Sequence, residues 1–80
     1  MVKMNAGYHI LKEEIYDVAE GIHGIALGYR ATPHTEYVTW GFTQTEKDIS
    51  YYWGHYFNDW AKAYKDYHER LASEYARMEG

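Results

Sequence analysis

The sequence contains no cysteine and a single proline among its 80 residues. Without cysteine it can form no disulfide, thiolate metal site or iron–sulfur cluster, and it has no thiol nucleophile, so its stability depends on packing. The composition is compatible with an intracellular protein. The sequence also lacks an apolar run near the ~18 residues that a membrane span needs, and no signal-peptide pattern stands near residue 1. We therefore expect a cytoplasmic protein that does not bind a membrane.

Basic residues are few. Lysine and arginine number 8, against 12 for aspartate and glutamate, which gives a formal net charge of −4. Because positive side chains supply most of the affinity for a phosphate backbone, a net-acidic chain without a basic segment is a poor general binder of nucleic acid. The charge balance therefore argues against nucleic acid as a partner.

Aromatic residues, by contrast, are abundant. They make up 19% of the chain, as ten tyrosines, three tryptophans and two phenylalanines. Each ring can bury about 150–250 Å², which suits a short chain with few aliphatic residues. The length allows one domain, so we expect residues 1–80 to form a single domain with a largely aromatic core.

The C-terminal segment has the clearest pattern, because large apolar residues recur there at steps of three and four, on one side of an α-helix. These residues are Trp60, Tyr64, Tyr67, Leu71, Tyr75 and Met78. Asn58 is a suitable N-cap, and Asp66 and Arg70 are spaced to form an ion pair on the solvated side. The pattern predicts a helix over about residues 59–78.

Three segments before this helix alternate in polarity as half-buried strands do, at residues 24–31, 36–43 and 49–57. The first segment, residues 8–20, is ambiguous. Leu11, Ile15 and Val18 have helical spacing, whereas residues 8–10 and 15–18 are rich in strand-forming types. We favour a strand that ends in a hairpin turn at residues 19–21, with a helix as the alternative.

The predicted fold is therefore α+β: a four-stranded antiparallel meander over about residues 8–57, with one C-terminal helix packed on one face. A single helix leaves the other face of a flat sheet without cover. We expect the helix to lie over Ile25, Leu27, Val38, Trp40, Phe42, Tyr51 and Trp53. On the opposite, uncovered face, the expected binding residues are Arg30, Tyr37, Thr39, Tyr52 and Tyr56.

That tyrosine-bearing face has two interpretations. It can be a solvated surface stabilised by cross-strand pairs, or a recognition surface, since tyrosine is enriched at protein interfaces. Glycines at 28, 41 and 54 would leave shallow hollows between the rings, or mark bulges. A protein partner, or a second copy stacked sheet against sheet as a homodimer, would use this face.

Catalytic and metal-binding patterns are missing from the sequence. The five histidines show no H-x₃-H or H-E-x-x-H spacing, so we expect no metal and no cofactor; they are His9, His23, His34, His55 and His68. His55 stands among aromatic residues, where a partly buried structural histidine is favoured over a catalytic base. Neither Ser50 nor Ser73 lies in a G-x-S-x-G context. We therefore expect that the protein is not an enzyme.

The alternative function is weak binding of single-stranded nucleic acid. Four-stranded sheets with exposed rings hold such strands by base stacking, and Tyr37, Tyr52 and Tyr56 would supply the rings. Arg30 would be the only nearby cation on a net-acidic chain, so the electrostatic part of this mechanism is missing.

Three stretches carry a resemblance: IALGYR at residues 25–30, YVTW at 37–40, and YYWGHYF at 51–57 with its following helix. Over about residues 24–70 they resemble small uncharacterised proteins of bacterial plasmids, conjugative elements and phages. The resemblance implies a bacterial, cytoplasmic accessory protein, and short acidic proteins of such elements often block a host enzyme. The leading expectation is a non-enzymatic protein-interaction module, in its most specific form a mobile-element-borne inhibitor of a nucleic-acid-processing or defence enzyme.

Overall fold

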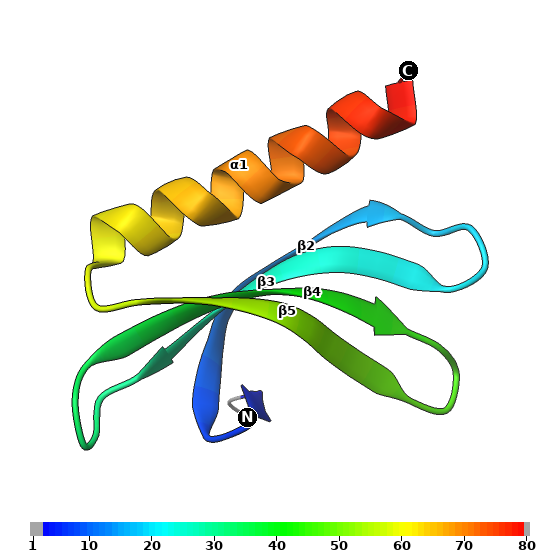
Figure 1. Cartoon of the computed structure of the whole chain (residues 1–80). Coiled ribbons are helices and arrows are strands. Elements are labelled where there is room, and N and C mark those ends of the chain that lie inside the picture. Colours follow the sequence, from blue (N-terminus) through cyan, green and yellow to red (C-terminus); the bar gives the residue numbers. More distant parts are fainter. Residues whose placement is uncertain (1–2, 80) are drawn as a thin grey trace.

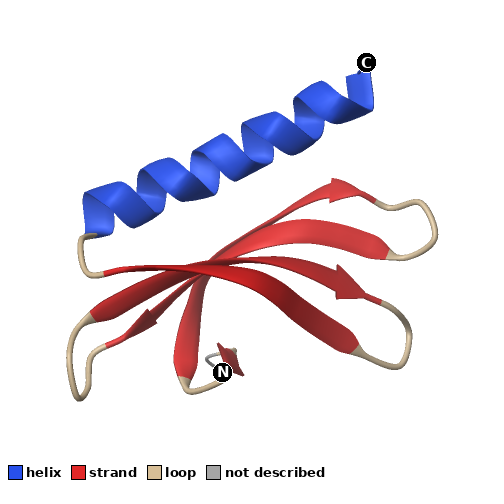
Figure 2. Cartoon of the chain, viewed as in Figure 1, coloured by secondary structure: helices blue, strands red, loops and turns tan. Residues whose placement is uncertain are grey.

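Five antiparallel strands and one C-terminal helix make up the computed structural model, which describes residues 3–79 (Figures 1 and 2). In chain order the elements are β1 (Met4–Asn5), β2 (Tyr8–Asp17), β3 (Ile22–Arg30), β4 (Glu36–Gln44), β5 (Ile49–Phe57) and α1 (Trp60–Glu79). Each strand pairs with its neighbour in sequence, which confirms the predicted α+β class, the antiparallel meander and the C-terminal helix. Residues 1, 2 and 80 of the predicted domain lie outside the described residues.

The sheet has five strands rather than the predicted four. The additional strand, β1, has only two residues and turns back onto β2 through Ala6 and Gly7, whose φ angles are both positive. Two residues are too few to show an alternation in the sequence. The preferred interpretation of the first segment is confirmed, since β2 is a strand; the helically spaced Leu11, Ile15 and Val18 are all exposed, and the helix alternative is wrong.

The helix packs on the sheet through a short apolar stripe. Ala63, Tyr67 and Leu71 are buried against Ile25 and Leu27 of β3. The outer members of the predicted stripe, Trp60, Tyr75 and Met78, remain 40–48% exposed. Within residues 3–79, no helix combines the length and the apolar character needed to cross a bilayer.

The cap of α1 lies one residue later than predicted. Asp59, not Asn58, is the N-cap: its side chain accepts the backbone N–H of Ala61 at 3.1 Å, and its carbonyl accepts that of Ala63 at 3.1 Å. An aspartate here satisfies a free N–H group and also places its negative charge at the positive end of the helix dipole.

The register between β3 and β4 changes the composition of both faces. Ile25 pairs with Gly41, and Leu27 pairs with Thr39. Directly paired residues lie on the same face, so the alternate residues Tyr37, Thr39 and Gly41 of β4 face the helix. The residues of β4 expected beneath the helix therefore point the other way; they are Val38, Trp40 and Phe42.

The two residues of β5 that were expected beneath the helix do not contact it either. Tyr51 packs with the far-face residues of β4, and Trp53 is mostly exposed, so both predicted helix contacts are wrong.

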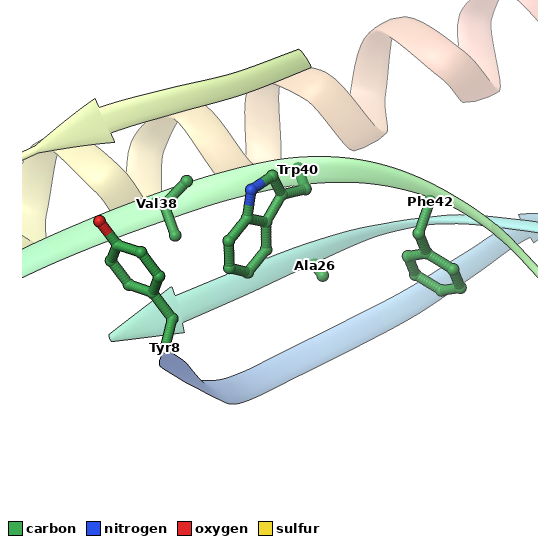
Figure 3. Close-up of a cluster of buried hydrophobic side chains, with 5 residues drawn as sticks. All are labelled: Tyr8, Ala26, Val38, Trp40 and Phe42. Carbon is green, nitrogen blue, oxygen red and sulfur yellow. The ribbon is translucent and has the colours of Figure 1, made fainter. Parts of the chain in front are cut away.

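The face away from α1 is buried as well. Its five core side chains are 0–5% exposed, and Figure 3 shows them gathered on one side of β3 and β4; they are Tyr8, Ala26, Val38, Trp40 and Phe42. The strands arch away from α1, with β1 and the start of β2 below the arch (Figure 1). Two register shifts in β2 and one opposite Trp40 in β5 explain the curvature, because bulges bend a strand and increase its twist. The expectation of an uncovered sheet face was wrong.

Aromatic rings fill the hollows that the strand glycines were expected to leave. Trp40 covers Gly28, Tyr52 covers Gly41, and Tyr56 folds over Gly54. A Cβ atom added at these glycines would lie 2.7, 2.6 and 2.9 Å from the respective rings. Glycine in these strands therefore permits a close approach between ring and backbone instead of opening a hollow.

Candidate functional site

The five residues predicted to form one binding surface lie on two different faces. Thr39 is fully buried beneath α1, and Tyr52 lies on the same face, over Gly41. Tyr37 also packs on the helix side, with its ring edge-on to Trp60 at 5.6 Å. The two remaining residues, Arg30 and Tyr56, lie on the far face beside Tyr8. The structure therefore does not bring the predicted set together.

Arg30 takes part in an internal cluster. Its Nη2 donates to Glu36 at 2.7 Å, and its guanidinium lies 4.6 Å from the centre of the Tyr8 ring. Tyr8 donates its hydroxyl to the same carboxylate. Burial raises the pKa of Tyr8 to about 12, and the hydrogen bond to Glu36 adds to this effect. The cluster ties β2, β3 and β4 together at one end of the core on the far face of the sheet, and Tyr56 beside it is 59% exposed.

A cleft on the helix side is the better candidate. It has a volume of about 900 Å³ and lies between α1 and the sheet. Each of the four long strands contributes to it: Tyr16 from β2, Ile25 from β3, Gly41 from β4, and Tyr52, Trp53 and His55 from β5, facing Arg70, Glu74 and Arg77 of α1. The sheet side is mostly apolar and aromatic, and the helix side is charged. Its size and lining fall in the range of ligand-binding sites in proteins.

A polar network beside the cleft joins β4, β5 and α1. The hydroxyl of Thr39 donates to Oδ2 of Asp66 at 2.5 Å, and Nδ1 of His55 lies 2.9 Å from the same oxygen. Nη1 of Arg70 donates to the carbonyl and the hydroxyl of Thr39, both at 3.1 Å, and to the carbonyl of Trp53 at 2.8 Å. Burial lowers the pKa of Arg70, which the charge of Asp66 opposes. The network satisfies a threonine that is buried between helix and sheet.

This network replaces the predicted solvated ion pair between Asp66 and Arg70. Both side chains reach inward to Thr39 instead. An i,i+4 spacing places two side chains next to each other on a helix. It does not show whether that side of the helix faces water or the sheet, so it fits both a solvated ion pair and the observed network. His55 was expected to be partly buried, but its side chain is 50% exposed, so this part of the prediction is wrong. Its contact with Asp66 fits a structural role.

Trp53 is the most unusual residue of the cleft. Its φ angle is +52°, and its side chain is 78% exposed at the rim. With Gly54 it forms a bulge opposite Trp40, since Thr39 pairs with His55 and Gly41 pairs with Tyr52. The left-handed position of such a bulge is normally glycine, because a Cβ atom there crowds the backbone. A bulky residue held in this conformation costs of order 1–3 kcal/mol and is typical of functional sites.

We expect glycine to be more stable than alanine at position 53. Trp53→Gly should exceed Trp53→Ala in free energy of unfolding by about 1 kcal/mol, because only glycine adopts positive φ without steric cost. Both variants remove the same exposed ring, so their difference isolates the backbone strain. Urea denaturation followed by far-ultraviolet circular dichroism measures it. Equal stability of the two variants would show that the bulge is unstrained.

Comparison of the chain with protein-family models, with curated proteins and with solved structures finds no match. In the part of the chain that the structure describes, no three histidine, aspartate or glutamate side chains are grouped closely enough to hold a metal ion. The cleft and Trp53 are therefore the features of the molecule that indicate a function.

Proposed function

We propose that the protein is a non-enzymatic protein-interaction module that contacts its partner through Trp53 and the adjacent cleft. The observation that carries this proposal is an exposed tryptophan in a strained backbone conformation. Tryptophan is enriched among the residues that dominate binding energy at protein interfaces. A strained backbone conformation lowers the stability of the folded chain, and such strain is typical of residues that bind a partner.

In its most specific form, the proposal is a mobile-element-borne inhibitor in the bacterial cytoplasm, which blocks a nucleic-acid-processing or defence enzyme. The net charge of −4 supports this version, since enzymes that hold nucleic acid present basic surfaces to it. Electrostatic attraction would speed the encounter, and Trp53 would anchor the complex once formed.

The hydrogen bonds beside the cleft fit a structural role for His55 and Asp66. His55 and Asp66 are arranged like the base and the orienting carboxylate of a hydrolase, with Nδ1 2.9 Å from Oδ2. Such a pair can activate a hydroxyl, a thiol or a bound water. The nearest hydroxyl of the network, on Thr39, is fully buried and already donates to Asp66.

Single-stranded nucleic acid is the second candidate. Trp53 and Tyr52 offer exposed and half-buried rings beside two arginines, Arg70 and Arg77, which is the pairing of stacking and charge that such sites use. Arg77, however, is neutralised by Glu74 at 2.6 Å. A lack of any tryptophan quenching by short oligonucleotides at low salt would eliminate this candidate, since phosphate contacts are strongest there.

Photo-crosslinking from position 53 tests the proposal. A photoreactive phenylalanine analogue replaces Trp53, the protein is expressed in bacterial cells, and irradiated adducts are identified by mass spectrometry. The matched control carries the same analogue in place of Val18, which is 73% exposed and lies in the turn between β2 and β3. We expect a discrete protein adduct from position 53 that is missing from position 18.

The remaining outcomes of the crosslinking experiment are equally informative. Adducts with nucleic acid from position 53 would favour the second candidate. The same adducts from both positions would indicate nonspecific contact and would contradict the proposal, as would the absence of any adduct from position 53. Circular dichroism of both substituted proteins shows that each is folded.

A further inference from the structure

Trp53 is 78% exposed at the rim of the cleft, and its side chain forms part of the lining. A two-fold axis beside the cleft would let each copy offer its exposed tryptophan to the cleft of the other. We infer that two copies of the chain associate by inserting Trp53 of each into the cleft of its partner. This inference rests on the proposed function, since it takes Trp53 and the cleft as the contact surface, so a second copy and a different protein partner would compete for Trp53. It replaces the predicted sheet-against-sheet dimer, whose face is buried within the curled sheet.

The lining of the cleft suits an indole ring. Tyr16, Ile25 and Tyr52 offer apolar and aromatic contact from the sheet. Burial and the charge of Glu74 raise the pKa of Tyr16 to about 12, as expected for a phenol on a partly desolvated wall of the cleft. A buried tryptophan also needs an acceptor for its ring N–H. The carboxylate of Glu74, which lies in the cleft and has one oxygen bound by Arg77, supplies that acceptor.

Charge also favours this patch as the contact between copies. The charged residues of the lining are Arg70, Glu74 and Arg77, and Asp66 of the adjacent network balances the remaining positive charge. The whole net charge of −4 therefore lies elsewhere on the chain. Two copies repel each other least when their neutral patches meet, and added salt screens the remaining repulsion. The dimer should consequently become tighter as salt increases, whereas binding to nucleic acid would become weaker.

Sedimentation equilibrium of the wild type and of Trp53→Gly tests the inference. We expect the wild type to pass from monomer to dimer between low and high micromolar concentration. Added salt should lower the concentration at which the dimer forms. Trp53→Gly should weaken association at least about 30-fold, the loss expected for an interface hot spot. Because this variant relieves strain at the bulge, it stays folded, which circular dichroism verifies.

Tyr56→Ala is the matched control, since it removes another exposed ring of β5 from the opposite face of the sheet and should leave the dimer intact. A wild type that stays monomeric at high concentration and high salt would overturn the inference. If Trp53→Gly dimerised as tightly as the wild type, the inference would also be overturned, because the contact between copies would then lie elsewhere. In either case, a crosslink from position 53 to a different protein would leave the proposed function standing.

Discussion

Replacing Trp40 with alanine should cost about 3–5 kcal/mol of the free energy of unfolding, the usual price of removing a buried tryptophan. Trp40 is 4% exposed and is the central ring of the core on the far side of the sheet. It meets Tyr8 edge-on at 5.6 Å and Tyr51 at 5.4 Å, and it lies directly on Gly28. No smaller side chain can keep these three contacts, so the curled sheet would close over a cavity.

A domain of 80 residues has a total stability of about 4–12 kcal/mol, so this loss would leave Trp40→Ala marginally folded. Urea denaturation followed by circular dichroism measures the change. Trp53→Ala is the matched control, because it deletes the same side chain from a position that is 78% exposed and should change the stability by at most about 1 kcal/mol. Similar losses in the two variants would show that the far face is open to water.

The parts of the fold that could be predicted from the sequence are those that depend on local pattern. Alternation of polarity placed three strands, and steps of three and four placed α1, because each pattern reflects neighbours within one element. Even there, β1 was missed, since Met4 and Asn5 show no alternation. The N-cap was misplaced by one residue, because Asn58 and Asp59 are equally good caps.

The pairing of faces could not be predicted, because register is not a local property. Sliding one strand by a single residue moves all its side chains to the other face and leaves its own alternation unchanged. The prediction grouped Leu27 with Trp40, whereas the structure pairs Leu27 with Thr39. Thr39 therefore lies beneath the helix and not on a binding surface. Arg30 and Tyr56 share the far face, while Tyr37 and Tyr52 share the near one.

The candidate site was missed for a related reason. The prediction treated the sheet as flat, so that one helix could cover only one side. Bulges make it curl, and the bulge at Trp53 turns this residue out of the face on which its alternation would place it. A tryptophan followed by glycine is a weak signal of a bulge, and the sequence held no stronger one. Asp66 and Arg70 join the site because their flank of α1 packs against Thr39 of β4.

Alkaline unfolding between pH 10 and pH 12 is the second large expected effect. Burial raises the pKa of Tyr67 to about 12, from an ordinary value of 10.0, and Tyr8 behaves alike. Above pH 10 the unfolded chain loses these phenolic protons while the folded chain keeps them. The unfolded state is therefore favoured increasingly as pH rises, until the folded pKa is passed. Each residue's difference corresponds to about 3 kcal/mol, so the two together approach the whole stability of a small domain.

Tyr67→Phe separates this effect from general alkaline damage. Tyr67 is 1% exposed, and removing its hydroxyl should move the alkaline midpoint to higher pH with little change in stability at neutral pH, since the ring and its packing are kept. Tyr56→Phe makes the same chemical change on a ring that is 59% exposed, and its midpoint should match that of the wild type. Circular dichroism and phenolate absorbance, recorded along one pH titration, follow unfolding and ionisation together. If the folded protein ionised all its tyrosines near pH 10 without unfolding, the buried phenols of Tyr8 and Tyr67 would have to be open to water, and both cores would need to be reconsidered.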